Sequence, residues 1–181
     1  MLNSWFYSIS IRSAGFSTID IGNVQDGPLL VTMALMFIGG ASGTTAGGIK
    51  VATFAVLLVA IFATILGRER PEIFGREIRR SDIDRALTIA LVGLALVFIT
   101  VLALSITEDA PFIVILFEGI SAFATCGLSM GLTPDLSDPG RVIIILAMFI
   151  GRLGTLTLVL ALVQRKRVER RRLAEEKVRI G

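Results

Sequence analysis

Residues 39–48 read GGASGTTAGG, and five of these ten residues are glycine. They lie within residues 28–66, a stretch of 39 residues whose only charged member is Lys50. One straight helix of that length would extend about 58 Å, roughly twice the thickness of the hydrocarbon core of a bilayer. The stretch must therefore bend, break or protrude, and the glycines predict an irregular break. Irregular backbone at membrane depth is tolerated only inside protein or beside a water-filled cavity.

The composition of the whole chain is that of a membrane protein. Of its 181 residues, 54% are hydrophobic and only 18% are charged, whereas a soluble domain carries about 25% charged residues. The basic residues gather in two segments, 67–85 and 164–181, beside apolar runs. This placement is typical of the cytoplasmic ends of membrane spans and argues against a soluble enzyme or a nucleic-acid-binding protein. The absence of histidine excludes Ser-His or Cys-His catalysis and a histidine-based metal site.

Two further apolar runs have the length of a membrane span. Residues 86–106 are apolar or small throughout, and residues 142–163 contain one charge, Arg152, near their middle. Between these runs, residues 111–124 form a helix-like segment only about 21 Å long, which favours a re-entrant helix over a crossing. Two crossings return the chain to its starting side, so both basic segments are predicted to be cytoplasmic and the connector 107–141 external.

An internal repeat relates the two ends of the chain at a single offset of 112 positions, without a gap over about 45 residues. The sequence MFIG at residues 36–39 recurs at residues 148–151. The same offset aligns further pairs, namely Gly15 with Gly127, Ser17 with Ser129, Asp26 with Asp138 and Thr45 with Thr157. Chance similarity of two apolar segments is the alternative, and the four-residue identity and matched glycines favour a duplicated unit.

Each copy reads as a short helix, a glycine-containing extended segment, an external turn and a helix directed inward, which is the pattern of a pore loop. The short helix points the negative end of its dipole toward mid-membrane. Backbone carbonyls of the extended segment can replace the water shell of a cation, and the central glycine relaxes the backbone. The predicted ligands are backbone carbonyls, with the Cys126 oxygen acting rather than its sulfur. They belong to Ser13, Ala14, Gly15, Phe16, Thr125, Cys126, Gly127 and Leu128.

These segments resemble the TrkH/KtrB family of potassium uptake transporters over essentially the whole chain. Residues 12–20 (RSAGFSTID) and 39–50 (GGASGTTAGGIK) resemble its third pore-loop unit. Its fourth unit is matched by Phe117-Glu118 and by residues 121–123, 125–132 and 151–154. The resemblance implies four span–pore-loop–span units around one pore, one glycine in each filter strand, and an intramembrane gate in the broken inner helix of unit three. It also implies K⁺ or Na⁺ as the transported ion, no cofactor, a dimer, and a cytoplasmic nucleotide-binding regulatory ring of the TrkA/KtrA type.

We therefore expect an all-α polytopic protein of the inner cell membrane. Residues 1–66 are expected to be a truncated third unit with a broken inner helix, 67–85 a cytoplasmic loop, 86–163 the fourth unit and 164–181 a basic cytoplasmic tail. Two filter strands cannot close a four-sided ring. The missing N-terminal units are therefore expected in a longer protein or in a complementary chain. A non-conducting membrane scaffold subunit and a small two-pore-loop channel dimer remain alternatives, and none of the three is an enzyme.

The predicted gate combines the glycine-rich segment with two cations. Its residues are Gly39, Gly40, Ser42, Gly43, Gly47, Gly48, Lys50 and Arg152. Glycines at every fourth position could instead form a helix-packing face, and a Ser42/Lys50 hydrolase dyad lacks any predicted oxyanion site. A phosphate-binding loop would need lysine where Ile49 stands.

Three further charged features have two interpretations each. Arg152 faces the pore or gate, or pairs with Glu118 within the bundle. Glu118 supports the filter by hydrogen bonds, or adds negative potential to the ion path. The basic tail 164–181 anchors the topology near anionic lipid, or docks the regulatory ring.

Overall fold

The computed structural model describes residues 2–12, 14–41, 44, 46–68, 70–73 and 75–153, and the described part is mostly helical. Its α-helices are α1 (Leu2–Ser10), α2 (Asp26–Phe37), α3 (Val51–Ile65), α4 (Arg80–Thr107), α5 (Phe112–Ala124) and α6 (Asp138–Leu153). Two 3₁₀ turns, η1 (Ile21–Asn23) and η2 (Thr133–Asp135), precede α2 and α6. A short antiparallel hairpin of β1 (Glu72–Ile73) and β2 (Arg76–Glu77), which the sequence did not predict, joins α3 to α4.

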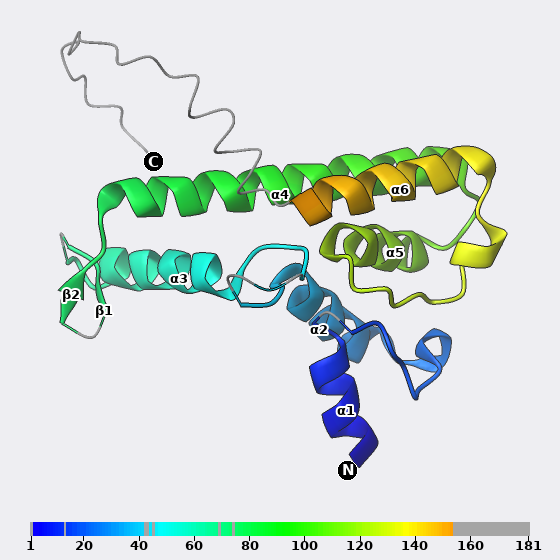
Figure 1. Cartoon of the computed structure of the whole chain (residues 1–181), viewed down its shortest axis with the longest axis horizontal. Coiled ribbons are helices and arrows are strands. Elements are labelled where there is room, and N and C mark those ends of the chain that lie inside the picture. The colour runs from blue at the N-terminus through cyan, green and yellow to red at the C-terminus, as the bar shows by residue number, and fades with distance from the viewer. Residues whose placement is uncertain are drawn as a thin grey trace, which may run out of the picture.

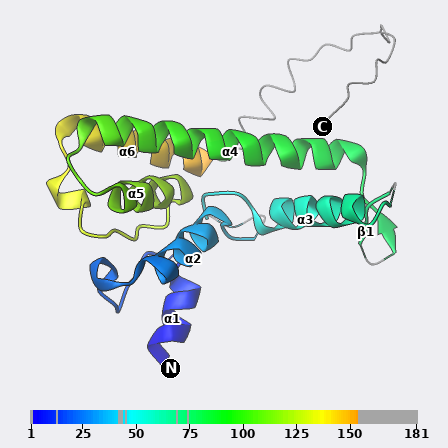
Figure 2. The same cartoon turned by 180° about the vertical axis from the view of Figure 1, so that it is seen from behind.

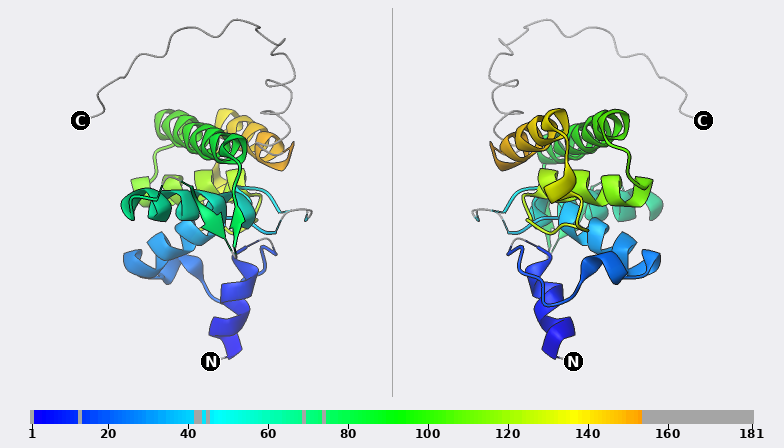
Figure 3. Two further views of the ribbon diagram at one scale, coloured as in Figure 1. Left: turned by 90° about the vertical axis from the view of Figure 1, so that its left-hand side faces the viewer. Right: turned by 90° about the vertical axis from the view of Figure 1, so that its right-hand side faces the viewer.

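The helices form three layers. The long helix α4 and helix α6 run side by side along one flank, and α5 and α3 lie beneath them (Figure 1). Helix α2 packs against α5, and α1 lies at the far side from α4, as the end views show (Figure 3). The β1–β2 hairpin is at one end of the molecule, whereas the α4–α5 connection and η2 are at the other (Figure 2). The two kinds of connection are therefore separated by the length of α4.

Helix α4 is, within the described residues, the helix whose length and hydropathy suit a membrane crossing. Only 33% of its most apolar window is buried inside the protein, and Phe98 and Ile106 are 66% and 79% exposed. Helices α2, α3 and α5 are apolar but shorter. Helix α6 covers the first part of the predicted span 142–163, and residues 154–163 and the tail 164–181 lie outside the described residues.

The apolar stretch 28–66 is interrupted between Phe37 and Val51, where the glycines predict a break. We call residues 38–50 the inner loop. Its two ends are joined by backbone hydrogen bonds from Gly39 N to Ile49 O (2.8 Å) and from Ile49 N to Phe37 O (3.0 Å). A continuous helix with a glycine packing face is therefore wrong for the described residues of this loop.

The repeat predicted from the sequence is also present in the backbone. The 3₁₀ turns begin at Ile21 and Thr133, and the helices that follow begin at Asp26 and Asp138. Both pairs differ by the same 112 positions that align the sequences. The two copies therefore take the same course from the short helix to the start of the inward helix.

Two apolar clusters hold this arrangement together. One joins α2, α5 and the segment after α5 through Met36, Phe117 and Leu128, which are at most 3% exposed, and Tyr7 of α1 packs against it. The other joins α4, α5 and α6 through Leu104 and Phe123. Glycine is required where α5 crosses α4, because a Cβ on Gly119 would lie 2.8 Å from Val101 Cγ2. The clusters hold α5 between the long helices and the inner loop.

Candidate functional site: two glycine segments and the inner loop

Two non-helical segments follow the short helices and meet backbone to backbone. We call residues 14–20, after α1, the first glycine segment, and residues 125–132, after α5, the second. Gly15 and Gly127 both adopt positive φ, +69° and +87°. A Cβ placed on Gly15 would lie only 2.5 Å from the Cys126 carbonyl oxygen and 3.3 Å from Gly127 Cα. The glycines that the offset pairs in sequence are therefore in contact in space.

Each glycine segment is tied to its own short helix by a serine. Ser10 Oγ donates a hydrogen bond to the Phe16 carbonyl, and Ser121 Oγ donates to the Leu128 carbonyl at 2.6 Å. Phe16 and Leu128 are equivalent in the repeat, so the carbonyl one residue after the glycine is engaged by the helix in both copies. The sequence did not predict this role for either serine; Ser121 is only one of the residues 121–123 that resemble the fourth unit. Ser13 lies outside the described residues.

A second serine fixes the turn that follows each segment. Ser17 Oγ accepts a hydrogen bond from Ile19 N (3.1 Å), and Ser129 Oγ accepts one from Gly131 N (3.0 Å). Donors and acceptors are both related by the repeat offset. A hydroxyl that captures an amide two residues later is a common turn device. The duplicated hydrogen bonds give both segments the same turn.

Helix α5 ends in a left-handed residue directly before the second glycine segment. Thr125 has φ 49° and ψ 37°, a conformation that is uncommon for a β-branched residue. The negative end of the α5 dipole lies at this point. Cys126 Sγ donates to the Ile11 carbonyl at 2.7 Å, and the side chain is buried. Its sulfur is thus held in the core, whereas its carbonyl oxygen faces Gly15.

Glu118 connects α5 to the external end of the second glycine segment. It is 3% exposed, and its Oε1 accepts hydrogen bonds from Ser129 Oγ (2.9 Å) and Thr133 Oγ1. Its Oε2 is buried without a hydrogen-bond partner among the described residues, beside a cavity of about 130 Å³ that Gly127 and Leu128 also line. No ion pair joins Glu118 to Arg152 in the described part of the chain, so this predicted alternative is not observed. Thr133 was not predicted, because it lies just beyond residues 125–132, the segment that resembles the fourth unit.

The inner loop reaches the start of the second glycine segment. Gly47 N donates to Thr125 Oγ1 at 3.2 Å. A Cβ on Gly47 would lie 2.6 Å from the Ala124 carbonyl oxygen, so only glycine allows this approach. Lys50 folds back onto the loop, where its Nζ donates to the carbonyls of Ala46 (2.5 Å) and Thr44 (3.2 Å). The described loop is therefore closed on itself and packed under the end of α5.

Most of the remaining predicted gate residues belong to the inner loop itself. Gly39 and Gly40 lie at its start, and Gly48 has φ +71° near its end. Ser42 and Gly43 lie outside the described residues. Arg152 is exposed in the last described turn of α6, close enough to Lys50 for the two like charges to repel. Its neighbour Gly151 lies against the Phe123 backbone, where no Cβ would fit.

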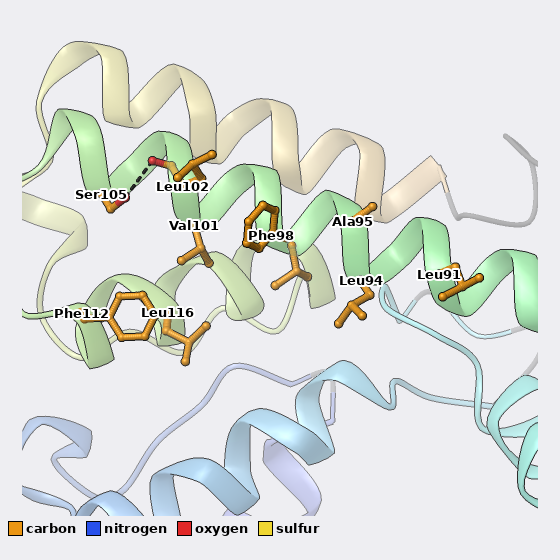
Figure 4. Close-up of a pocket in the computed structure, with 10 residues that line it drawn as sticks. Leu91, Leu94, Ala95, Phe98, Val101, Leu102, Ser105, Phe112 and Leu116 are labelled. Carbon is orange, nitrogen blue, oxygen red and sulfur yellow. Dashed lines mark hydrogen bonds between the residues drawn. The ribbon is translucent and has the colours of Figure 1, made fainter. Parts of the chain in front are cut away.

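A cavity of about 550 Å³ on the surface of α4 and α5 has a different character (Figure 4). Hydrocarbon side chains such as Leu94, Phe98 and Leu116 line it, and its one hydroxyl, Ser105 Oγ, already donates to the Leu102 carbonyl at 2.9 Å. No cluster of three or more acidic, cysteine or histidine side chains occurs among the described residues.

The matches to known proteins cover nearly the whole chain. A family model described as TrkH, cation transport protein, matches residues 1–170. The Ktr system potassium uptake protein B of Bacillus subtilis is 47% identical over 156 residues, which cover 86% of this chain and 35% of that protein. The potassium/sodium uptake protein NtpJ of Enterococcus hirae is 43% identical over 187 residues, covering 100% of this chain and 42% of that protein. The Ktr system potassium uptake protein B of Vibrio alginolyticus is 41% identical over 157 residues, covering 87% and 34%.

The chain therefore spans between about a third and two fifths of the length of these relatives. The family model covers nearly the whole chain, including both glycine segments and the inner loop. The names of the relatives describe uptake of potassium, or of potassium and sodium, and two of them describe components of a Ktr system. The family is one of membrane transport proteins and is not a class of enzymes. The chain belongs to the TrkH family of cation transport proteins.

Proposed function

We propose that this chain supplies two of the four pore-loop units of a potassium or sodium uptake transporter. The observation that carries the proposal is the contact between Gly15 and Gly127. Two positive-φ glycines, each in a non-helical segment after a short helix, lie against each other although they are 112 positions apart. Two copies of one filter element must lie near each other if they line the same pore.

The proposed filter chemistry is replacement of water by peptide oxygens. A cation leaving bulk water needs several oxygen ligands at close range, and a ring of backbone carbonyls provides them. The carbonyls of Phe16 and Leu128 already accept serine hydrogen bonds. Among the described residues, the predicted ligands with the most freedom to face an ion are therefore the carbonyls of residues 14, 15 and 125–127. The carboxyl end of α5 adds a favourable negative potential.

The proposed gate is the inner loop. Its contact with Thr125 puts it directly below the second glycine segment, where it would block an ion that has passed the filter. Lys50 holds the loop closed through two carbonyls, and the nearby Arg152 adds a second positive charge. Two positively charged side chains beside the path of a cation raise the electrostatic barrier to its permeation. Opening would require the loop to leave the end of α5.

The proposed topology is multi-pass, with residues 67–85 and the tail 164–181 in the cytoplasm. It is supported by the separation of the β1–β2 hairpin from the η1 and η2 turns along the length of α4 (Figure 1). The charge distribution agrees, because six arginines lie in residues 67–85 and a single basic residue, Arg141, lies in the connector 107–141. The boundaries 1–66, 67–85, 86–163 and 164–181 remain our proposed division of the chain.

The proposed partners follow from family membership and from coverage. The relatives are more than twice as long as the matched region, so we propose that two further pore-loop units complete the ring, from one longer polypeptide or a complementary chain. A second copy of the transporter and a TrkA/KtrA-type cytoplasmic nucleotide-binding ring are the other proposed partners.

Reconstitution tests the function. The complete transporter containing this chain should carry ⁸⁶Rb⁺ into proteoliposomes, whereas the two units alone should not. Gly127→Ser in the complete transporter should change the preference between K⁺ and Na⁺. Gly131→Ser is the matched control. Gly131 also has positive φ (+98°), but a Cβ added there would meet nothing within 4 Å.

Four results would contradict the proposal. Absence of flux from the folded, complete transporter would favour a non-conducting scaffold, and flux from the isolated chain would favour a two-unit channel. Unchanged selectivity in Gly127→Ser, or an equal change in Gly131→Ser, would count against the filter assignment.

A further inference from the structure

A polar cavity of about 460 Å³ lies at the junction of α3, the β1–β2 hairpin and α4. Three arginines line it, Arg68 after α3, Arg70 before β1 and Arg80 at the start of α4. Arg70 pairs with Glu77 at 3.4 Å, and Asp84 is the other acid in the lining. The lining carries more positive than negative charge, and neither Arg68 nor Arg80 has an ion pair within the described part of the chain.

The arginines are arranged around a recess, unlike a scattered basic surface. Guanidinium groups present planar forks of N–H donors that match phosphate oxygens. Ala63, Ile78 and Ile83 contribute an apolar floor to the same cavity. The start of α4 adds to the attraction for an anion, because Arg79 at its N-cap makes no side-chain capping bond and the first-turn amides carry positive partial charge.

The location of the cavity decides which phosphate fits. Helix α4 is 28 residues long, about 42 Å, so its charged first turns extend beyond a hydrocarbon core of about 30 Å. The cavity thus lies at headgroup depth. Beside it, Phe62, Ile65 and Leu66 are 59%, 73% and 66% exposed. Acyl chains would cover these side chains, whereas a free phosphate would not.

We propose that this cavity binds the headgroup of an anionic phospholipid, with Arg68 and Arg80 holding the phosphate and the acyl chains lying along α3. The proposal rests on the membrane topology given under the proposed function. It assigns a lipid site to the folded connection between the two units, separate from the basic tail 164–181. Occupancy would fix the angle between α3 and α4, since the phosphate bridges the ends of both.

The test uses the complete transporter in detergent, with native mass spectrometry counting retained phosphatidylglycerol. Arg68→Gln/Arg80→Gln should weaken retention roughly 100-fold, because loss of the charge-assisted hydrogen bonds from each arginine to the phosphate costs on the order of a factor of ten in affinity. Arg76→Gln/Arg79→Gln is the matched control, since it removes the same charge from the same connection outside the cavity lining, and it should retain the lipid.

Equal losses in both double variants, or no loss in either, would overturn the proposal. Displacement of phosphatidylglycerol by an equal concentration of inorganic phosphate would overturn the lipid as the source of the phosphate. If the double variant does not fold, photoactivatable phosphatidylglycerol on the wild type decides, since cross-links should map to residues 60–84 and their absence there would refute the site. ⁸⁶Rb⁺ flux is measured on the same preparation, so that loss of the lipid site and failure of the transport proposal give different results.

Discussion

The two copies of the repeat have the same order of elements up to α2 and α6, and their structures differ after that point. In the first copy helix α2 ends at Phe37, and Gly39 bonds across the loop to Ile49. In the second copy helix α6 continues past the equivalent Phe149, through Gly151 to Leu153. Both copies read MFIG at this point. The next residue differs, because Gly40 disfavours helix by about 1 kcal/mol, whereas the equivalent Arg152 favours it.

The copies also differ in how the glycine segment is supported. The second copy has Glu118, which accepts hydrogen bonds from Ser129 and Thr133. The equivalent positions in the first copy are Phe6 and Ile21, so no carboxylate can act there. The second glycine segment therefore has a carboxylate support that the first lacks. In the proposed function, this asymmetry lets one unit form the gate while the other keeps the filter rigid.

The largest expected effect is the difference between an alanine substitution at Gly15 and one at Gly127. Alanine at either position is strained by about 1–2 kcal/mol, because both have positive φ. At Gly15 the new Cβ would also lie 2.5 Å from the Cys126 carbonyl oxygen, whereas at Gly127 the nearest atom is 3.5 Å away. Gly15→Ala should therefore lower ⁸⁶Rb⁺ uptake by the complete transporter roughly tenfold or more, and Gly127→Ala should lower it less. Equal losses in uptake would mean that the closer contact at Gly15 has no greater effect on transport than the looser contact at Gly127.

The next effect concerns the inner loop of the first copy. Gly47→Ala cannot keep the present contact with Ala124 and Thr125, so the inner loop must move away from α5. We expect a higher ⁸⁶Rb⁺ flux in the absence of the regulatory subunit. Gly27→Ala on α2 is the control, because a Cβ there would meet nothing within 4 Å. A normal or reduced flux in Gly47→Ala would argue against the loop as a barrier.

The polar support of the second copy gives a smaller effect that also separates two roles of Glu118. Glu118→Ala removes the acceptor of two hydroxyls and should lower stability by about 2–3 kcal/mol, with loss of ion selectivity. Glu118→Gln keeps an acceptor oxygen and should retain selectivity if the residue acts through hydrogen bonds. Thermal unfolding and K⁺/Na⁺ competition measure both. A strong loss of cation affinity in Glu118→Gln would instead assign the residue an electrostatic role.

The features that the sequence predicted are those set by length and local chemistry. The break in residues 28–66, the short helix before Thr125 and the matched glycines follow from helix rise, glycine content and one offset. The closure of the inner loop by the Ile38–Ile49 bridge and the contact of Gly47 with Thr125 could not be predicted, since they join residues whose spatial proximity depends on packing. The hydroxyl partners of Glu118 could not be predicted either, since they lie 11 and 15 residues away.

The smallest effect concerns the start of the inward helix. Ser137 precedes α6 and donates its hydroxyl and its backbone N–H (3.1 Å) to Glu108, whereas the equivalent Gln25 makes no side-chain capping bond. The Ser137 hydroxyl first, and then its N–H, lower the pKa of Glu108 below its ordinary value. Because the folded-state pKa is the lower one, the stabilisation is present above the unfolded pKa of about 4.3 and is lost as the pH falls through the folded pKa. The wild type should therefore unfold at a higher temperature than Glu108→Gln at pH 6, and the difference should vanish toward pH 3. A difference that stays constant with pH would show that the carboxylate charge plays no part, and Gln25→Ala in the first copy should show no such pH dependence.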